Sequence, residues 1–216
     1  MNNFQEIVEN TRKIFDDRTR VRDATLVQAR QLTRLSALTI RAIHRGETNE
    51  AHALLDEAYQ LVNTMQRDLK PYPELYHTGY THDAIKEFAE ANLTCALIEN
   101  QRLPRPEELG IDNADYVNGL AETIGELRRR CLDILRQGYS AEAERLLTTM
   151  DEIYNFLVTL DYPDAITNGL RRQTDLVRGI IERTRADLTL SLREQHLQEA
   201  LEQFSQKFPG MADTTS

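Results

Sequence analysis

The chain has 216 residues, of which 40% are hydrophobic and 28% are charged, and this balance is typical of a globular protein rather than a disordered chain. Its 9 glycines, 6 prolines and 6% aromatic residues are too few for an all-β fold, which consumes these residue types in strands and turns. The formal net charge of −9 argues against a simple electrostatic nucleic-acid binder, because such proteins are usually basic.

Sparse glycine and proline predict long helices with short breaks between them. The expected helices, in chain order, cover about 3–45, 48–69, 80–100, 112–137, 140–160 and 163–208. Gly46 and Gly138 are expected to end helices, since glycine adopts the left-handed conformation found there. Thr48 and Ser140 are the expected N-caps of the second and fifth helices.

The first and last expected helices each exceed 40 residues, which corresponds to rods roughly 60 Å long. Such rods cannot bury their whole length against helices of the same chain, so exposed stripes should pair with other copies. The pattern therefore predicts a single all-α domain over 1–208, a bundle of about six long antiparallel helices that oligomerises, with a disordered tail at 209–216.

Nothing in the pattern indicates a membrane or an oxidising compartment. No apolar run approaches the ~18 residues of a membrane span, and residues 1–13 lack the apolar stretch of a secretory signal. Cys95 and Cys131 lie far apart in sequence and are expected to be reduced thiols. We therefore expect a cytoplasmic protein that binds no membrane.

Pairs of glutamates at helical spacing are the residues most suited to chemistry. Glu87 and Glu90 are three residues apart, and Glu122 and Glu126 are four apart, so each pair lies on one face of its helix. All four fall away from the apolar stripe of their helix. Two such helices facing each other would offer oxygen ligands to Mg²⁺ or Mn²⁺, but on spacing alone a solvated surface is the favoured explanation.

Arginines form a second pattern. The first 46 residues carry nine Lys or Arg against five Asp or Glu, and one helix face there is basic, with Arg12, Arg30, Arg34, Arg41 and Arg45. Arg128 and Arg129 follow Glu126 after one leucine. Guanidinium groups suit phosphate recognition, so these positions are candidates for phosphate contact, with a solvated outer face as the simpler alternative.

Four segments carry a resemblance to a known family: YHTGYTHDAIKEFAEANL, RLPRPEELGI, DYVNGLAETIGELRRRCLDIL and GYSAEAERLLTTMDEIYNFL. They resemble the translin family, and more closely translin-associated factor X in its archaeal or bacterial form. The most specific segment is DYVNGLAETIGELRR, where the family pattern reads approximately DYLxGxADLTGELMR. Glu122 takes the place of the family's aspartate and adds one methylene.

The resemblance implies an all-helical protomer in a closed, hollow homo-oligomer, typically an octamer, that binds RNA or single-stranded DNA inside. The factor X branch is a metal-dependent endoribonuclease, and its acidic motif falls on Glu87, Glu90, Glu122 and Glu126. The resemblance also suggests that polar helix faces line a water-filled interior. Mg²⁺ or Mn²⁺ held by these glutamates would then assist phosphodiester cleavage.

The leading hypothesis is a Mg²⁺-dependent endoribonuclease acting on single-stranded or partly unpaired RNA. Candidates for RNA contact are Arg34, Arg41, His77, Tyr80, His82, Arg128 and Arg129. Three of these, His77, Tyr80 and His82, are assigned to the loop before the third helix and serve equally well as ordinary loop and cap residues. Two alternatives are open: a non-catalytic nucleic-acid-binding shell like translin itself, and an all-α nucleotide pyrophosphohydrolase, which also uses paired helical glutamates with Mg²⁺.

Overall fold

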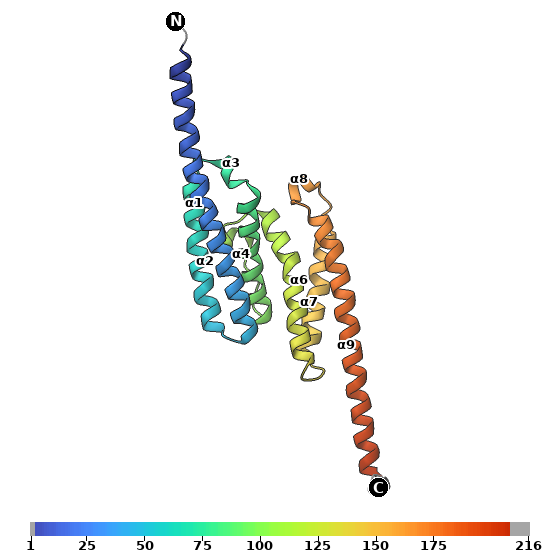
Figure 1. The fold of residues 1–216 in the computed structure, drawn as a ribbon. Coiled ribbons are helices and arrows are strands. Elements are labelled where there is room, and N and C mark those ends of the chain that lie inside the picture. Colours follow the sequence, from blue (N-terminus) through green and yellow to red (C-terminus); the bar gives the residue numbers. More distant parts are fainter. Residues whose placement is uncertain (1–2, 208–216) are drawn as a thin grey trace, which may run out of the picture. The chain divides into compact units, whose positions relative to one another are not determined.

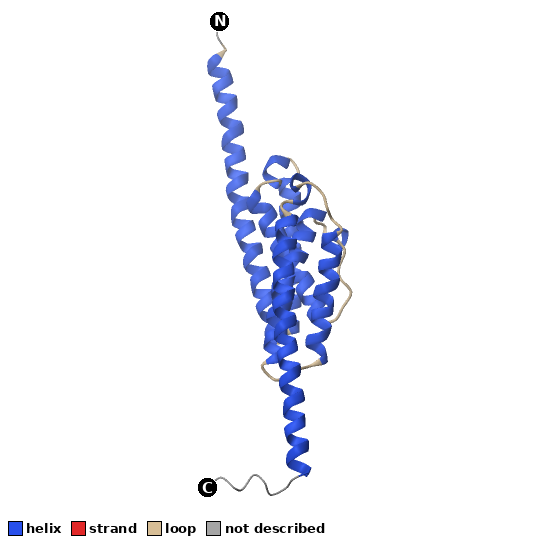
Figure 2. Ribbon diagram, turned by 90° about the vertical axis from the view of Figure 1, so that its right-hand side faces the viewer, coloured by secondary structure: helices blue, strands red, loops and turns tan. Residues whose placement is uncertain are grey.

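The computed structural model describes residues 3–207, and within this range every regular element is a helix (Figure 2). The all-α prediction is confirmed. The helices, labelled in Figure 1, are α1 (Phe4–Arg45), α2 (Thr48–Leu69), α3 (Pro73–Tyr76), α4 (Gly79–Ile98), α5 (Pro106–Leu109), α6 (Asn113–Leu135), α7 (Ala141–Val158), α8 (Asp164–Thr167) and α9 (Leu170–Lys207).

Most predicted helix boundaries agree with the structure because local chemistry determines them. Gly46 ends α1 in the left-handed conformation, with φ of 78°. Ser140 caps α7, and its hydroxyl oxygen accepts a hydrogen bond from the Glu142 N–H at 3.1 Å. The prediction for Thr48 is wrong, since Thr48 is already helical and Glu47 is the N-cap residue, without a side-chain cap.

The last predicted helix is not continuous. Residues 163–208 were expected to form one rod, but α8 ends at Thr167 and α9 begins at Leu170. Asn168 and Gly169 between them have positive φ values of 52° and 83°, a conformation that asparagine and glycine tolerate and that stops a right-handed helix. The predicted loops also contain short helices, α3 and α5, each beginning at a proline whose fixed φ suits a first helical position.

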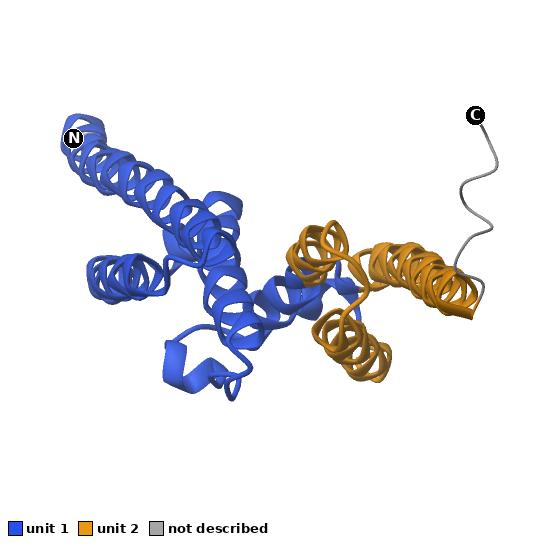
Figure 3. Cartoon of the chain, turned by 90° about the horizontal axis from the view of Figure 1, so that it is seen from below, with its two compact units in different colours: residues 1–123, 162–170 blue, residues 124–161, 171–216 orange. Residues whose placement is uncertain are grey.

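Contacts divide the chain into two compact units, coloured separately in Figure 3. The first comprises the chain up to Thr123 together with Tyr162–Leu170. In this unit α1 packs along both α2 and α4, and α2 also contacts α4. One end of this core is a buried cluster with Ala42 and Ile43 from α1, Ala51 from α2 and Cys95 from α4. The predicted tail, 209–216, lies outside the described residues.

The second unit comprises Ile124–Asp161 and the chain from Arg171 onward. Here α7 packs on the later turns of α6, where the Cys131 Sγ lies 3.7 Å from the Ala143 carbonyl oxygen. Arg185 on α9 donates to both carboxylate oxygens of Asp151 on α7, at 2.6 and 2.7 Å. Cys95 and Cys131 are both buried and free.

Two long helices are only partly covered in the protomer. The buried residues of α1 begin at Thr25, and Phe4, Ile7 and Phe15 in its first half are exposed. The last turns of α9 likewise expose Leu197, Leu201 and Phe204. In the part of the chain that the structure describes, no helix combines the length and the apolar character needed to cross a membrane.

Candidate functional site

The first unit brings α4 and the first turns of α6 into close contact at Gly119. A Cβ placed on Gly119 would lie 2.7 Å from the Ala89 Cβ and 2.9 Å from the Lys86 carbonyl oxygen. Both distances are below van der Waals contact, so only glycine allows the two backbones to approach this closely. This crossing lies beside Glu90 on α4, whose backbone nitrogen would be 3.0 Å from the same Cβ, and one turn before Glu122 on α6.

We expect Gly119→Ala to lower the free energy of unfolding by about 1–3 kcal/mol, because the added methyl group overpacks the crossing. Gly125→Ala is the matched control, since Gly125 lies on the same helix with nothing within 4 Å of an added Cβ. This change should instead stabilise the protein by about 0.5–1 kcal/mol through helix propensity. Urea unfolding followed by circular dichroism measures both values. Equal effects at the two positions would contradict the close approach.

The predicted glutamates of the first unit lie beside this crossing. Glu87 and Glu90 on α4 and Glu122 on α6 are all partly buried rather than fully solvated. Burial raises the pKa of the Glu87 carboxyl, and the negative charge of Glu122 raises it further. These two carboxylates, 35 positions apart in sequence, therefore interact electrostatically across the crossing. Glu126 follows Glu122 by one turn of α6 and pairs with Arg129 at 3.5 Å.

Lys86, which no helical pattern in the sequence marks, forms an ion pair with one of these carboxylates. The Lys86 Nζ donates to the Glu122 Oε1 at 2.8 Å, and the two side chains are 22% and 24% exposed. Burial alone lowers the pKa of Lys86, but its hydrogen bond to Glu122 and the charge of that carboxylate outweigh burial, so the net shift is upward. The only available signal was its position directly before Glu87.

As they stand, no three His, Cys, Asp or Glu side chains within residues 3–207 are arranged to hold a metal ion. The donor chemistry nevertheless fits a hard divalent cation. Glu87 and Glu122 would supply oxygen ligands, and the pKa of Glu87 is raised first by burial and then by the negative charge of Glu122. An additional positive charge between them would relieve their mutual repulsion.

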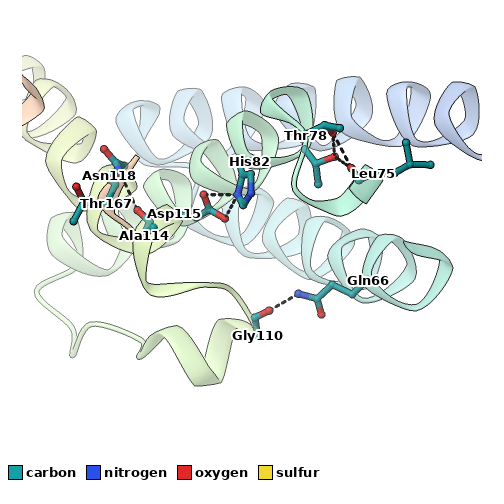
Figure 4. A network of polar contacts seen from close by, with 10 residues as sticks. Gln66, Leu75, Thr78, His82, Gly110, Ala114, Asp115, Asn118 and Thr167 are labelled. Carbon is teal, nitrogen blue, oxygen red and sulfur yellow. Dashed lines mark hydrogen bonds and ion pairs between the residues drawn. The ribbon is translucent and has the colours of Figure 1, made fainter. Parts of the chain in front are cut away.

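A second polar cluster joins the N-terminal turns of α4 and α6 (Figure 4). The His82 Nδ1 lies 2.9 and 2.8 Å from the two carboxylate oxygens of Asp115. A carboxylate is an acceptor, so Nδ1 carries the hydrogen and donates it. Asp115 is 3% exposed, and burial raises its pKa while the hydrogen bond from His82 opposes the rise. On the next turn of α6, the Asn118 side chain donates to the Thr167 carbonyl oxygen at 2.7 Å.

We expect Asp115→Ala to cost about 3 kcal/mol of stability, because it leaves His82 without its buried partner. Asp115→Asn should cost less, about 1–2 kcal/mol, since the amide oxygen still accepts the Nδ1 hydrogen. A double-mutant cycle with His82→Ala measures the coupling between the two residues. Additive effects of the two alanine substitutions would show that the pair contributes nothing beyond each residue alone.

Of the three residues predicted to lie in a loop, only His77 is outside a helix, as the C-cap residue of α3, whereas Tyr80 and His82 lie in the first turn of α4. The His77 and His82 rings stack with centroids 5.6 Å apart, and Tyr76 meets both rings edge-on. His77 is exposed and Tyr80 is partly buried. The Tyr80 hydroxyl is enclosed and hydrogen-bonds to no residue that the structure describes. His77 is therefore the most accessible ring of the three predicted positions.

The predicted arginines divide into exposed and engaged side chains. Arg34 and Arg41 on α1 are exposed, as are the other members of that basic face. In the second unit, Arg128 on α6 is bound to two residues of α9, with its Nη1 2.8 Å from the Asp187 carboxylate and 3.0 Å from the Thr184 hydroxyl. Arg128 thus has a structural role within its own unit. Arg129 is 52% exposed.

Three known proteins resemble the chain over most of its length. It is 34% identical to the uncharacterized protein MJ0175 of Methanocaldococcus jannaschii over 183 residues, which cover 84% of this chain and 81% of that protein. The solved structure of AfC3PO in complex with duplex RNA superposes with a TM-score of 0.80 at 32% identity, over 87% of this chain and 97% of that one. The chain belongs to the translin family, the family of the C3PO proteins.

The apo structure of a further C3PO protein, NeC3PO, has the same fold as this translin-family chain. Its TM-score is 0.78 at 23% identity, with 85% of this chain and 96% of that one covered. No family model matches the sequence. The family resemblance read from the residues is thereby confirmed at the level of the translin family.

Proposed function

We propose that this translin-family chain is a Mg²⁺- or Mn²⁺-dependent endoribonuclease of the factor X type. Glu87, Glu90, Glu122 and Glu126 are its proposed metal ligands. The observation that carries the proposal is the close crossing of α4 and α6 at Gly119, where burial and, second, the charge of Glu122 raise the pKa of Glu87. Carboxylates brought together against their mutual repulsion are typical of a cation site.

The bound ion would supply an activated water and a positive charge beside the phosphate. The residues of the chain would bind and orient the RNA. Arg34 and Arg41 are exposed on α1 and suited to the phosphate backbone. The exposed His77 ring is suited to stacking on an unpaired base, which favours single-stranded or partly unpaired RNA as substrate. AfC3PO has been solved with duplex RNA, so a fully paired duplex also belongs among the test substrates.

A non-catalytic RNA-binding oligomer is the second candidate. One observation favours it, namely that the described side chains include no group of three ready to hold a metal ion. A nucleotide pyrophosphohydrolase is the third, and it would act on free nucleoside triphosphates rather than on a chain. The endoribonuclease and the pyrophosphohydrolase differ in product, since only the pyrophosphohydrolase releases pyrophosphate.

The proposal is tested by incubating the purified protein with end-labelled RNA in Mg²⁺, in Mn²⁺ and in EDTA. Single-stranded, bulged and fully paired substrates are compared on a denaturing gel. We expect internal cleavage that needs the divalent ion and favours unpaired RNA. Binding without cleavage in either metal would select the RNA-binding candidate, and pyrophosphate release from nucleoside triphosphates would select the third.

We also propose that the protein is a homo-oligomer, with eight copies by family resemblance. Phe4, Ile7 and Phe15 on α1 and Leu197, Leu201 and Phe204 on α9 are exposed apolar side chains, which a second copy would cover. We expect sedimentation velocity to give six or more copies at micromolar concentration. Phe15→Glu combined with Leu201→Glu should shift the protein to smaller species. A monomer of about 25 kDa for the unaltered chain would contradict the assembly.

A further inference from the structure

Lys86 places its ammonium group in a negatively charged part of the proposed metal site. Its Nζ is 2.8 Å from the Glu122 Oε1, and the charges of Asp83 and Glu87 on its own helix also act on it. Glu122 on the facing helix is thus its hydrogen-bonded partner, and the two carboxylates of its own helix add negative charge nearby. A lysine ammonium is a compact point charge, and a compact cation is also what the proposed site is built to bind.

The ion pair and a metal ion would compete for the same oxygen. A divalent cation bound to the Glu122 carboxylate would lie close to the ammonium that now occupies it, and the two positive charges would repel. Both side chains are only about a quarter exposed, so water screens this repulsion weakly. The lysine therefore has to move off Glu122 for that carboxylate to become a ligand.

We propose that Lys86 is an internal competitor of the divalent ion: its ammonium holds Glu122 in the ion-free protein, and its release from Glu122 sets the metal affinity of the site. This inference rests on the proposed function, since it concerns the same carboxylates. It differs from a structural role, in which the ion pair only ties α4 to α6. A purely structural pair predicts that removing the lysine weakens the fold and leaves metal affinity unchanged or reduced.

Mn²⁺ binding, measured by calorimetry on the full chain without RNA, tests the competition. We expect Lys86→Met to bind Mn²⁺ at least tenfold more tightly than the unaltered protein, because nothing then opposes the ion at Glu122. Lys86→Arg should bind Mn²⁺ equally or more weakly, because a guanidinium fork grips a carboxylate at two points. Lys70→Met is the matched control, since it removes one lysine charge at an exposed position of the same unit and should change the affinity less than twofold.

The outcomes separate the inference from the proposed function. Mn²⁺ binding to the unaltered protein that Lys86→Met leaves within twofold, or weakens, would overturn the competition and leave the metal site in place. No Mn²⁺ binding by any variant at millimolar concentration would overturn the metal site and the competition together. If Lys86→Met binds Mn²⁺ and the unaltered protein does not, the competition is supported, because Lys86 then blocks the ion completely. Lys86→Gln, checked by circular dichroism, replaces Lys86→Met if the latter does not fold.

Discussion

Glu122→Gln should reduce RNA cleavage by about 100-fold or more while RNA binding is retained. The amide keeps the shape and one hydrogen-bond acceptor for Lys86, but it is a poor ligand for Mg²⁺. Losing a ligand removes several kcal/mol of transition-state stabilisation, and each factor of ten corresponds to about 1.4 kcal/mol. Because Glu122 is 24% exposed and paired, the expected loss of stability is about 1 kcal/mol, more than that of a fully solvated side chain.

Glu122→Asp is the decisive companion, because the family pattern has aspartate at this position. The shorter side chain lengthens the ion pair with Lys86 and still offers a carboxylate, so cleavage should be retained or raised. Glu57→Gln on the exposed face of α2 is the matched control and should cleave as the unaltered protein does. Rates are measured on one labelled RNA under single-turnover conditions with Mg²⁺. Undiminished cleavage by Glu122→Gln would exclude Glu122 from the catalytic site.

RNA affinity should fall about 10³-fold between about 50 and 200 mM salt if six or more phosphates are contacted, because each contact releases a counterion. The chain carries a net charge of −9, which repels RNA. The basic face of α1 would therefore have to attract the phosphates strongly enough to overcome this repulsion. Arg34→Ala with Arg41→Ala should weaken binding about tenfold for all sequences and lower the slope of log affinity against log salt by about 2.

Arg22→Ala with Arg67→Ala removes the same charge from exposed positions away from this face. This control pair should change the affinity less than threefold. Fluorescence anisotropy with single-stranded and duplex RNA in Mg²⁺-free buffer measures binding without cleavage. If both double variants weaken binding equally, the effect is one of net charge, and the basic face of α1 is an ordinary solvated surface.

The sequence determined the features that depend on neighbours along the chain. Gly46 and Ser140 end and begin helices through local backbone chemistry, and these boundaries were predicted correctly. The break at Asn168 and Gly169 carried a local signal of the same kind, but the long helical pattern around it masked that signal. Helical spacing likewise placed each glutamate pair on one face of its helix without any knowledge of the fold.

Only the tertiary structure decided what lies across from each face. The effect of the Glu122 charge on the pKa of Glu87 depends on the close approach of α4 and α6 at Gly119, two helices distant in sequence. The helical wheel placed the glutamates away from the apolar stripe and so suggested full exposure. In the structure α1, α2 and α3 contact α4, and Glu87 and Glu90 on it are partly buried, as are Glu122 and Glu126 on α6. The partners of Lys86 and Asp115 were hidden for the same reason, since a hydrogen bond between residues more than 30 positions apart leaves no periodic trace in the sequence.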